Sequence, residues 1–462
     1  MPYPISLMRP TDSLNTGQGM NGNAFDVYFA PVGYTETSSY VTSDGWNSYE
    51  RQQFQSVFDR IEEVANVNFN ITTSSYQAEY ILVLDTNESY FYGASTLGYF
   101  YLPNGFSSQL VGVFNGDMWD RFSGGDLEKG GYSYTTMMHE MLHGMGLGHP
   151  HDTAGGTDIL DGVTSDFGDY GDYGLNQGVY TTMTYNTGHE TGVQGDWGWQ
   201  WGYEAGPMAL DIAVLQELYG ANTTHASGNN TYVMPGANVS GTAWEAIWDT
   251  GGTDTIVFSG STDATVDLRD ATLEYEAGGG GFISSVTGVA GGFTIAHGVV
   301  IENATTGRGD DTITGNEARN IIKTGAGDDS VFGGAGRDKV KGNGGRDDLF
   351  GEAGRDKLVG GAGSDFLMGG TGNDKLKGGG GADIFVFDSA GGHDSVKDFG
   401  RGNDVLEISS VFWSGVSTAQ QLVDRYADDS GDDVVFNFGT RDSLTIENVA
   451  DAQSLVDHIN FF

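Results

Sequence analysis

The sequence predicts an α+β domain followed by an all-β parallel roll with β-sandwich-like flanks. Two patterns lead to this fold class: residues 23–222 show helix and strand periodicities of ordinary length, and residues 306–386 repeat a nine-residue pattern of glycine and aspartate. A third observation is the charge, because 63 Asp and Glu stand against 21 Lys and Arg, a formal net charge of -42. A chain with this balance attracts cations.

Composition excludes several classes of protein. Such acidity repels nucleic acid and anionic lipid, so we expect no nucleic-acid partner. The chain contains no cysteine, which excludes disulfides and thiolate metal sites. No apolar run approaches the roughly 20 residues needed to span a membrane, so we expect no membrane span.

The α+β domain is predicted to contain three helices and three strands. The helices are predicted from apolar residues at helical spacing and from the glycines that end two of them. The strands are predicted from short runs of β-branched, aromatic and aliphatic residues. The predicted ranges are 46–67, 134–144 and 211–219 for the helices, and 80–85, 98–102 and 111–115 for the strands.

The second half is dominated by nine consecutive units of nine residues, from Thr306 to Val386. Each unit predicts a glycine-rich turn of six residues and a minimal strand with one inward apolar side chain. One apolar residue per unit cannot offset the entropy of ordering the chain, so we expect several structural calcium ions between adjacent turns. A flexible glycine-rich linker is the alternative, but a linker would not keep aspartate and the apolar residue in phase nine times.

The calcium ligands expected in the repeats are turn glycines and sixth-position aspartates. The second unit has Asn320 at the sixth position, so we expect a weaker calcium shell there. The expected ligands are Gly307, Gly309, Asp311, Gly325, Gly327, Asp329, Gly334, Gly336, Asp338, Asp347, Gly354, Asp356, Gly361, Gly363, Asp365, Gly370, Gly372, Asp374 and Asp383.

Residues 138–150, MHEMLHGMGLGHP, carry the pattern of a metal centre. A helix places His139 and His143 on one face, and a glycine turn after the helix brings His149 round as a third ligand. Three neutral imidazoles that leave one coordination position open are typical of a catalytic zinc site. We therefore expect one zinc ion, with Glu140 beside it as the general base.

The motif H-E-x-x-H-x-x-G-x-x-H is similar to that of the metzincins, in which a methionine turn underlies the zinc histidines. The segment TTMTYN at Thr181–Asn186 resembles that turn. Together with Pro150, the segment LDIAVLQELYGAN at Leu210–Asn222 and the nonapeptides, it most resembles the serralysin family of RTX-type bacterial metalloproteases, over roughly residues 40–410. The resemblance implies that Tyr185 is a switchable further zinc ligand that stabilises the oxyanion, and that Met183 is a structural floor.

The resemblance also implies features that spacing alone does not give. WDTGGTD at Trp248–Asp254 and VIEN at Val300–Asn303 resemble calcium sites ahead of the repeats. Residues 111–115 lie where the family has an edge strand that pairs with an extended peptide, which implies broad specificity. His151 and the other histidines outside the motif are expected on the surface or in loops. The ligands implied ahead of the repeats are Asp249, Gly251, Gly252, Asp254 and Glu302.

The fold class is then an α+β metzincin catalytic domain followed by a calcium-binding parallel β-roll of RTX repeats with β-sandwich-like flanks. Five segments are expected. They are a leader or N-terminal arm at 1–22, the zinc peptidase domain at 23–222, a β-rich lead-in at 223–305, the nonapeptide roll at 306–386 and a C-terminal β cap with the export signal at 387–462.

The function implied is that of a secreted, extracellular zinc metalloendopeptidase with protein or peptide substrates. Its start lacks an apolar signal segment, and the resemblance implies a bacterial monomer exported by type I secretion machinery through an uncleaved C-terminal signal. The alternative is a catalytically inactive RTX calcium-binding surface or adhesion protein. A matrixin-like or astacin-like metzincin is a third hypothesis, which Pro150 and the nonapeptides disfavour.

Overall fold

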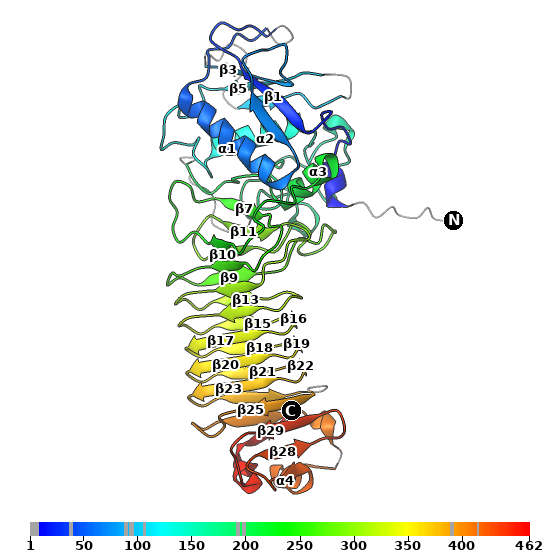
Figure 1. Cartoon of the computed structure of the whole chain (residues 1–462), viewed down its shortest axis with the longest axis vertical. Helices are drawn as coiled ribbons and strands as arrows, with labels where there is room; N and C mark the ends of the chain where they lie inside the picture. The colour runs from blue at the N-terminus through cyan, green and yellow to red at the C-terminus, as the bar shows by residue number, and fades with distance from the viewer. Residues whose placement is uncertain are drawn as a thin grey trace, which may run out of the picture. The chain divides into compact units, whose positions relative to one another are not determined.

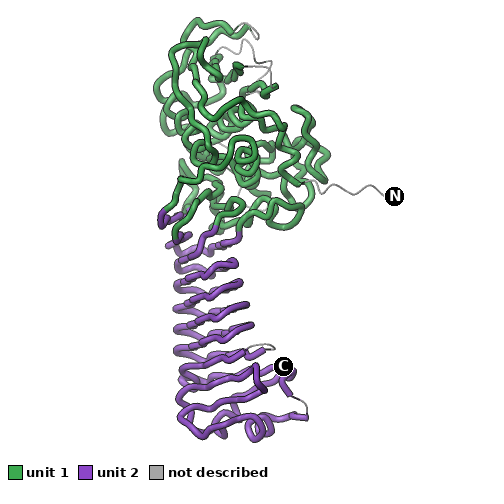
Figure 2. The backbone as a smooth tube through the Cα atoms, turned by 45° about the vertical axis from the view of Figure 1, so that its right-hand side comes forward, with its two compact units in different colours: residues 1–227, 235–252, 270–299 green, residues 228–234, 253–269, 300–462 purple. Residues whose placement is uncertain are grey.

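The computed structural model describes residues 9–36, 40–86, 91, 97–104, 108–190, 195, 200–388, 392–413 and 415–462. The chain forms two compact units, drawn in green and purple in Figure 2. Unit 1 comprises 1–227, 235–252 and 270–299, and unit 2 comprises 228–234, 253–269 and 300–462. None of the helices in the described ranges has the length and apolar composition needed to cross a bilayer.

Unit 1 is built on a five-stranded sheet in the order β2-β1-β3-β5-β4. The first four strands are parallel, and β4 is antiparallel to β5. The fully buried β3 confirms the strand predicted at 80–85. The strand bounds are β1 (Ala24–Phe29), β2 (Asn68–Ile71), β3 (Tyr80–Asp85), β4 (Gly98–Phe100) and β5 (Leu110–Asn115).

The position of the edge strand differs from the expectation. Residues 111–115 fall in β5, which lies between β3 and β4, so the prediction that they form the edge is wrong. Within the described residues the free edge on this side belongs to β4. The assignment of 111–115 to the edge came from the family resemblance, whereas the apolar run of β5 reflects its burial between two neighbouring strands.

Three helices pack with the sheet, as predicted: α1 (Ser48–Val64), α2 (Tyr132–Gly144) and α3 (Ala209–Tyr219) (Figure 1). The side chain of Asn47 caps α1 by accepting the Glu50 N–H, and Glu50 Oε2 accepts the Asn47 N–H in return. Phe54 and Phe58 on the buried face of α1 pack edge-on and tilted against the aromatic core, so the helix is fixed to the sheet.

Unit 1 also contains short elements. The arm after residue 9 packs on the unit, because Leu14 is buried and the Met20 N–H donates to the hydroxyl of Tyr219 at 2.9 Å. Strand β11 pairs in parallel with β7 and antiparallel with β10. The bounds are η1 (Pro10–Ser13), η2 (Ala154–Gly156), η3 (Asp172–Gly174), β7 (Trp244–Ile247), β10 (Ser284–Val286) and β11 (Gly292–Ile295).

Unit 2 is mostly β structure in long parallel sheets, as a β-roll requires. Successive nonapeptides alternate between two sheets, so each strand pairs in parallel with the strand 18 residues further on, as in Val331↔Leu349 and Lys339↔Lys357. Figure 1 shows these strands stacked one above the other. One sheet has the order β30-β26-β24-β21-β18-β15-β13-β9, the other β27-β28-β29-β25-β23-β20-β17-β14-β12-β8-β6, and a small third sheet β16-β19-β22.

The core of the roll is a single column of apolar side chains between the two sheets. All nine predicted inward residues are at most 2% exposed, which confirms that each unit contributes one apolar side chain. They are Ile313, Ile322, Val331, Val340, Leu349, Leu358, Leu367, Leu376 and Phe385.

The bounds in the repeat region are β12 (Asn303–Thr305), β13 (Thr312–Thr314), β14 (Ile321–Lys323), β15 (Ser330–Phe332), β16 (Ala335–Gly336), β17 (Lys339–Gly344), β18 (Asp348–Phe350), β19 (Ala353–Gly354), β20 (Lys357–Ala362), β21 (Phe366–Met368), β22 (Thr371–Gly372), β23 (Lys375–Gly380) and β24 (Ile384–Phe387). The flanking elements are β6 (Thr231–Val233), β8 (Thr255–Val257), β9 (Ala264–Asp267), β25 (His393–Val396), β26 (Val405–Ile408), η4 (Ser410–Phe412), α4 (Ala419–Tyr426), β27 (Ala427–Asp428), β28 (Val434–Asn437), β29 (Ser443–Ile446), η5 (Ala452–His458) and β30 (Ile459–Phe461). The flanking strands continue the same two sheets.

Candidate metal centre

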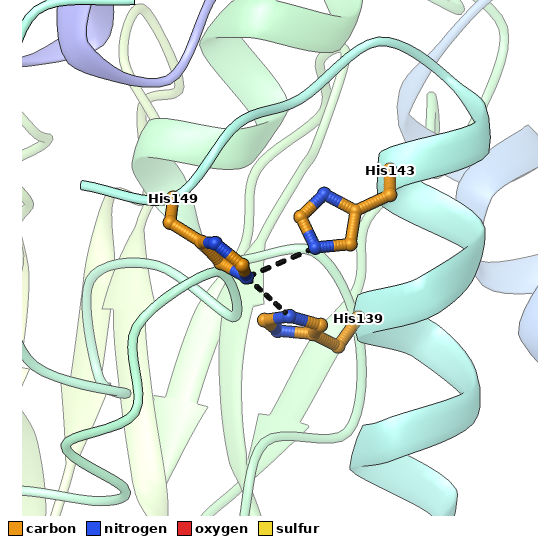
Figure 3. Close-up of side chains that lie close together, drawn as sticks. All are labelled: His139, His143 and His149. Carbon is orange, nitrogen blue, oxygen red and sulfur yellow. Dashed lines mark hydrogen bonds between the residues drawn. The ribbon is translucent and has the colours of Figure 1, made fainter. Parts of the chain in front are cut away.

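Three imidazoles converge at the C-terminal end of α2 (Figure 3). His139 and His143 lie one turn apart on the helix, and the chain reverses at Gly146 to bring in His149. Gly146 has φ +103°, and a Cβ there would lie 2.5 Å from the carbonyl oxygen of Gln18. Only glycine fits this turn, so it fixes the position of the third histidine.

Each histidine has its Nδ1 atom engaged by an acceptor. Nδ1 of His139 lies 2.8 Å from the Thr182 carbonyl, and Nδ1 of His143 lies 2.8 Å from the Leu147 carbonyl. Nδ1 of His149 lies 2.9 Å from Asp152 Oδ2. These acceptors place the ring proton on Nδ1 and leave the Nε2 lone pairs free.

The Nε2 atoms face one another without a proton between them. His149 Nε2 lies 3.1 Å from His139 Nε2 and 3.0 Å from His143 Nε2, the approaches dashed in Figure 3. Burial lowers the pKa of His139 and His143 to about 3 and that of His149 to about 4, so all three are neutral. Three converging neutral Nε2 lone pairs are the donor set of a zinc site, so the residues fit a bound zinc ion.

Glu140 lies beside the triad and is buried, with 7% of its surface exposed. Burial raises the pKa of its carboxyl to about 8, and a hydrogen bond from the Phe100 backbone acts in the opposite direction. Its Oε2 has no hydrogen-bond partner among the described residues. When the carboxyl is ionised, this unpartnered oxygen can accept a proton from a water molecule at the centre.

Tyr185 and Met183 come from the loop after the triad. The ring centre of Tyr185 lies 4.9 Å from that of His149 and 5.9 Å from that of His139. Burial, followed by the charge of Glu140, raises the pKa of Tyr185 to about 12, so its hydroxyl keeps its proton and can donate a hydrogen bond. Met183 is fully buried.

Asp211 anchors this loop, and the sequence did not single it out. Its Oδ1 accepts the Thr181 hydroxyl at 2.6 Å, and its Oδ2 accepts the Thr182 N–H at 2.7 Å and the Met208 N–H at 2.9 Å. Because the Thr182 carbonyl orients His139, Asp211 at the start of α3 acts on the metal centre through one intervening residue.

His151 and Asp152 also belong to the centre. His151 lies in a turn, in keeping with the expectation of a surface or loop position, but it is not on the surface: it is 7% exposed and its ring stacks on that of His149 with 4.7 Å between the ring centres. With His149 they form a second cluster of possible metal-binding atoms. The signal that could have found them is their closeness in the sequence, because they follow the third histidine by two and three residues.

A cleft of about 420 Å³ opens on the centre. Leu97 and Gly98 at edge strand β4 line it together with Glu140. A Cβ on Gly98 would lie 3.1 Å from Glu140 Cγ, which places the sheet edge against the carboxylate. The other lining residues are Tyr132, Thr135, Thr136, His139, Phe167, Thr182, Thr184, Tyr185, Thr187 and Glu204.

The repeat aspartates form a second kind of site. From Asp329 to Asp383, each Oδ1 accepts the N–H of the residue 18 positions earlier, for example Asp338 N–H to Asp356 Oδ1 at 2.8 Å. Asp311 Oδ1 instead accepts the Ala264 N–H at 2.8 Å. The Oδ2 atoms are buried and have no hydrogen-bond partner among the described residues. Carboxylate oxygens in this state fit a hard cation such as calcium. The residues with such an Oδ2 are Asp311, Asp329, Asp338, Asp347, Asp356, Asp365, Asp374 and Asp398.

Turn glycines are required where the backbone has positive φ and the next turn lies against it. Gly363 has φ +136°, and a Cβ there would overlap the carbonyl oxygen of Gly345. Among the expected glycine ligands, Gly327, Gly334, Gly336, Gly354, Gly361, Gly363, Gly370 and Gly372 have positive φ. A Cβ added to Gly307, Gly309 or Gly325 would likewise overlap a backbone carbonyl of the adjacent turn.

Asn320 occupies the sixth position of the second unit differently from an aspartate. Its Nδ2 donates to the Glu302 carbonyl at 2.9 Å and to Asn316 Oδ1 at 3.0 Å. The hydrogen-bond donors of this amide are therefore used within the protein, and the side chain offers no anionic ligand. Asp383, at the sixth position of the ninth unit, accepts the Asp365 N–H at 3.0 Å.

The aspartate ladder continues past the last nonapeptide. Asp394 Oδ1 accepts the Asp374 N–H at 2.8 Å, and Asp404 Oδ1 accepts the Asp383 N–H at 3.0 Å. Asp398 Oδ1 accepts the Gly378 N–H at 3.1 Å. The sequence missed these residues because the spacing changes after Val386, although D-S-V and D-V-L keep aspartate two residues before an apolar side chain.

The residues implied ahead of the repeats fall in both units. In unit 1, Asp249 Oδ1 accepts the Gly251 N–H at 2.9 Å, and Gly251 and Gly252 have positive φ. In unit 2, Glu302 Oε2 accepts the Asp254 N–H at 2.7 Å, and Asp254 is fully buried. The structure thus brings Asp254 and Glu302 together.

The fold and these clusters define a protein with a three-histidine cluster that could hold a metal ion and a parallel roll lined by carboxylates. The family model described as Peptidase M10 serralysin C terminal matches residues 216–459. The chain belongs to the serralysin family.

Three relatives illustrate the similarity. The chain is 33% identical over 275 residues to a serralysin of Photorhabdus luminescens, covering 56% of this chain and 51% of that protein. It is 35% identical over 206 residues to a serralysin of Proteus mirabilis, covering 42% and 38%. It is 34% identical over 204 residues to metallopeptidase AprA of Pseudomonas marginalis, covering 42% and 39%. The chain therefore spans about half or less of the length of these relatives.

Proposed function

We propose that the chain is a secreted zinc metalloendopeptidase that hydrolyses peptide bonds of extracellular proteins with broad specificity. The observation that carries this proposal is the triad of Nε2 lone pairs with the unpartnered carboxylate oxygen of Glu140 beside it. The names of the relatives, serralysin and metallopeptidase, support the same activity.

Zinc, bound by His139, His143 and His149, would supply a Lewis acid that activates water and polarises the scissile carbonyl. Glu140 would accept the proton of the attacking water and pass it to the leaving amine. Tyr185, which keeps its proton at neutral pH, would donate a hydrogen bond to the carbonyl oxygen as its negative charge develops.

The substrate would bind as an extended peptide along β4. The edge of β4 lines the cleft at Leu97 and Gly98, next to Glu140. Pairing through backbone groups leaves side chains free to vary, which supports broad specificity. The three imidazoles would be oriented by the acceptors of their Nδ1 atoms, which hold each ring in one tautomer.

Calcium would be structural, held by the aspartates and turn carbonyls of the roll. The segment boundaries at 22, 222, 305 and 386, export by type I machinery through an uncleaved C-terminal signal, and a monomeric state are part of the same proposal. An inactive calcium-binding surface or adhesion protein is the less supported function, because the three histidines and Glu140 are all present and assembled.

The decisive experiment compares casein hydrolysis by the wild type and by Glu140→Gln, with zinc and calcium content measured for both. We expect both proteins to contain one zinc ion and the variant to lose about 10²–10⁴-fold in rate. Zinc-loaded wild type without hydrolysis would refute the enzymatic function. A fully active variant would refute the role of Glu140.

A further inference from the structure

One sheet of the roll carries an array of basic side chains in a chain that is otherwise strongly acidic. We call this array the cationic face. It consists of three rows that run across the strands, and in one of them Val359 takes the place of a lysine. Two rows are lysines, Lys339, Lys357 and Lys375 in one and Lys323, Lys341 and Lys377 in the other. The third row, Arg319, Arg337 and Arg355, precedes the turn aspartates.

The register of the strands makes these rows straight. Lys339 pairs with Lys357, and Lys357 pairs with Lys375, so their side chains follow one another at the strand spacing of about 4.8 Å. Residues two apart on a strand share a face, so Lys341 lies on the same side as Lys339. The corresponding positions of the other sheet hold Ser330, Asp348 and Phe366, so the array is confined to one sheet.

The protein makes little internal use of these charges. All nine side chains are exposed, and within the described ranges none forms an ion pair, whereas the neighbouring Lys397 pairs with Glu447 at 2.8 Å. Like charges on paired strands repel and destabilise the sheet. The fold does not require a cation here, because Val359 occupies the same row as Lys341.

Neutralising the turn carboxylates does not explain the array. Burial raises the pKa of Asp338 to about 7, and Arg319 acts against it only as a weaker influence. No lysine of the cationic face is among the groups that affect this carboxylate. The lysines therefore point their charge to solvent instead of to the turns.

A groove of about 410 Å³ runs along this face. Seven of its ten lining residues are lysine or arginine, among them Arg337, Lys339, Arg355, Lys357 and Lys375. A groove with regularly repeated cations matches a ligand with regularly repeated anions.

We propose that the cationic face binds a linear acidic polysaccharide, a chain whose sugars carry carboxylates, lying across the strands along the rows of lysine. Lysine and arginine donate charge-assisted hydrogen bonds to carboxylates, and one row offers a donor at every second unit of the repeat. This binding would hold the protein on an anionic matrix independently of the metal centre.

The surroundings favour a polysaccharide over nucleic acid or a membrane. The outward positions of β14, β17, β20 and β23 hold no phenylalanine, tyrosine or tryptophan, the rings on which single-stranded bases stack. The net charge of -42 repels an extended anionic surface. A narrow polysaccharide chain contacts only the cationic face, because at physiological salt the repulsion from the acidic residues elsewhere on the protein is screened beyond about 8 Å.

The test is calorimetric titration of the full calcium-loaded chain with oligogalacturonates too short to gel with calcium. We expect binding that weakens as salt is raised, and about tenfold weaker binding for Lys339→Gln/Lys357→Gln/Lys375→Gln. The control, Arg308→Gln/Arg346→Gln/Arg401→Gln, removes the same charge from exposed positions outside the face and should bind like the wild type. Circular dichroism in calcium checks that both fold, and Lys341→Gln/Lys377→Gln replaces the first variant if it does not fold.

Three results would overturn the proposal. They are no binding at low salt, an equal loss in the lysine and arginine variants, and tighter binding of an oligothymidylate or of phosphatidylglycerol vesicles. Casein hydrolysis measured in parallel keeps this test separate from the proposed enzymatic function, because the lysine variants should retain the wild-type rate.

Discussion

Asp347→Asn is expected to change the stability of the roll in opposite directions with and without calcium. Asp347 is fully buried, its Oδ1 accepts the Asp329 N–H at 3.1 Å, and its Oδ2 has no hydrogen-bond partner in the described structure. Asparagine keeps the shape and the Oδ1 acceptor but removes the charge. Asn320 shows that an amide at this position can donate to a backbone carbonyl.

Without calcium, the negative charge of Asp347 destabilises the folded roll. Burial, and then the charges of neighbouring aspartates, raise the pKa of Asp347 from 3.8 to about 7. The carboxyl of Asp347 therefore keeps its proton to a higher pH in the folded chain than in the unfolded chain. The protonated carboxyl's contribution to the free energy of unfolding is present at low pH and is lost as the pH rises through about 7. At about 1.4 kcal/mol per pKa unit, the ionised carboxyl lowers the free energy of unfolding by at most about 4 kcal/mol, which we halve for solvent screening. The variant is therefore expected to be about 2 kcal/mol more stable than the wild type at pH 8 without calcium.

With calcium the charge is a partner of the ion. Removing one member of a buried ion pair costs about 3–5 kcal/mol, which corresponds to a loss of roughly 10 °C in Tm. The assay is far-UV circular dichroism of the full chain, as thermal melts in saturating calcium and as folding by trimethylamine N-oxide in chelator at pH 5 and pH 8. We expect a lower Tm in calcium, a lower osmolyte midpoint in chelator at pH 8, and a smaller shift at pH 5.

The matched control is Asp348→Asn. Asp348 is the next residue, lies half-buried at the start of β18 and carries the same charge. It should shift neither midpoint by more than a few tenths of a kcal/mol. Equal signs of the Asp347→Asn effect in calcium and in chelator, or equal effects of the two variants, would show that Asp347 is not a calcium ligand.

Two further predictions follow from the site geometry. Asp211→Ala should weaken zinc binding about 10–100-fold, because it releases the turn that orients His139. The affinity is measured by competition with a chromogenic chelator, and Glu217→Gln on the same helix is the control. Equal zinc affinities of the two variants would disprove the positioning role of Asp211. Gly363→Ala should destabilise the calcium-loaded roll by at least about 2 kcal/mol, because Gly363 has φ +136° and its new Cβ would overlap the Gly345 carbonyl oxygen. The control is Gly380→Ala, whose new Cβ has no atom within 4 Å, so its thermal melt should match that of the wild type. Similar melts for the two variants would contradict the close packing of the turns.

The roll was the more predictable half because its physics is local and repeated. All nine units specify a turn and one inward apolar residue, and all but the second also specify an aspartate at the sixth position, so repeated copies of the pattern indicate one geometry. The prediction stopped at Val386 because a fixed period was the signal. The ladder that continues through Asp394 and Asp404 keeps the hydrogen bond but stretches the connection to 20 and 21 residues, which the backbone permits in a longer turn.

The metal centre was predictable in its ligands but not in their supports. Helix geometry specifies the positions of His139 and His143, and the glycine turn after the helix specifies that of His149. The acceptors that fix the tautomers are set by tertiary structure: a carbonyl of Thr182, a carbonyl of Leu147 and the carboxylate of Asp152. No periodicity signals a carbonyl that points at a ring, so the roles of Asp152 and Asp211 emerge only in three dimensions.

The error about the edge strand has a physical cause that bears on function. A strand buried on both sides has the strongest apolar signal, so a search for strands finds β3 and β5 first. The strand open to a substrate needs an unpaired edge and is short, as β4 is with three residues. The sequence predicted a strand at 98–102, but nothing in its short pattern showed that this strand lies at the edge of the sheet. A substrate-binding edge is better located from the metal centre outward, from the side chain of Glu140 to the glycine against which it packs, Gly98.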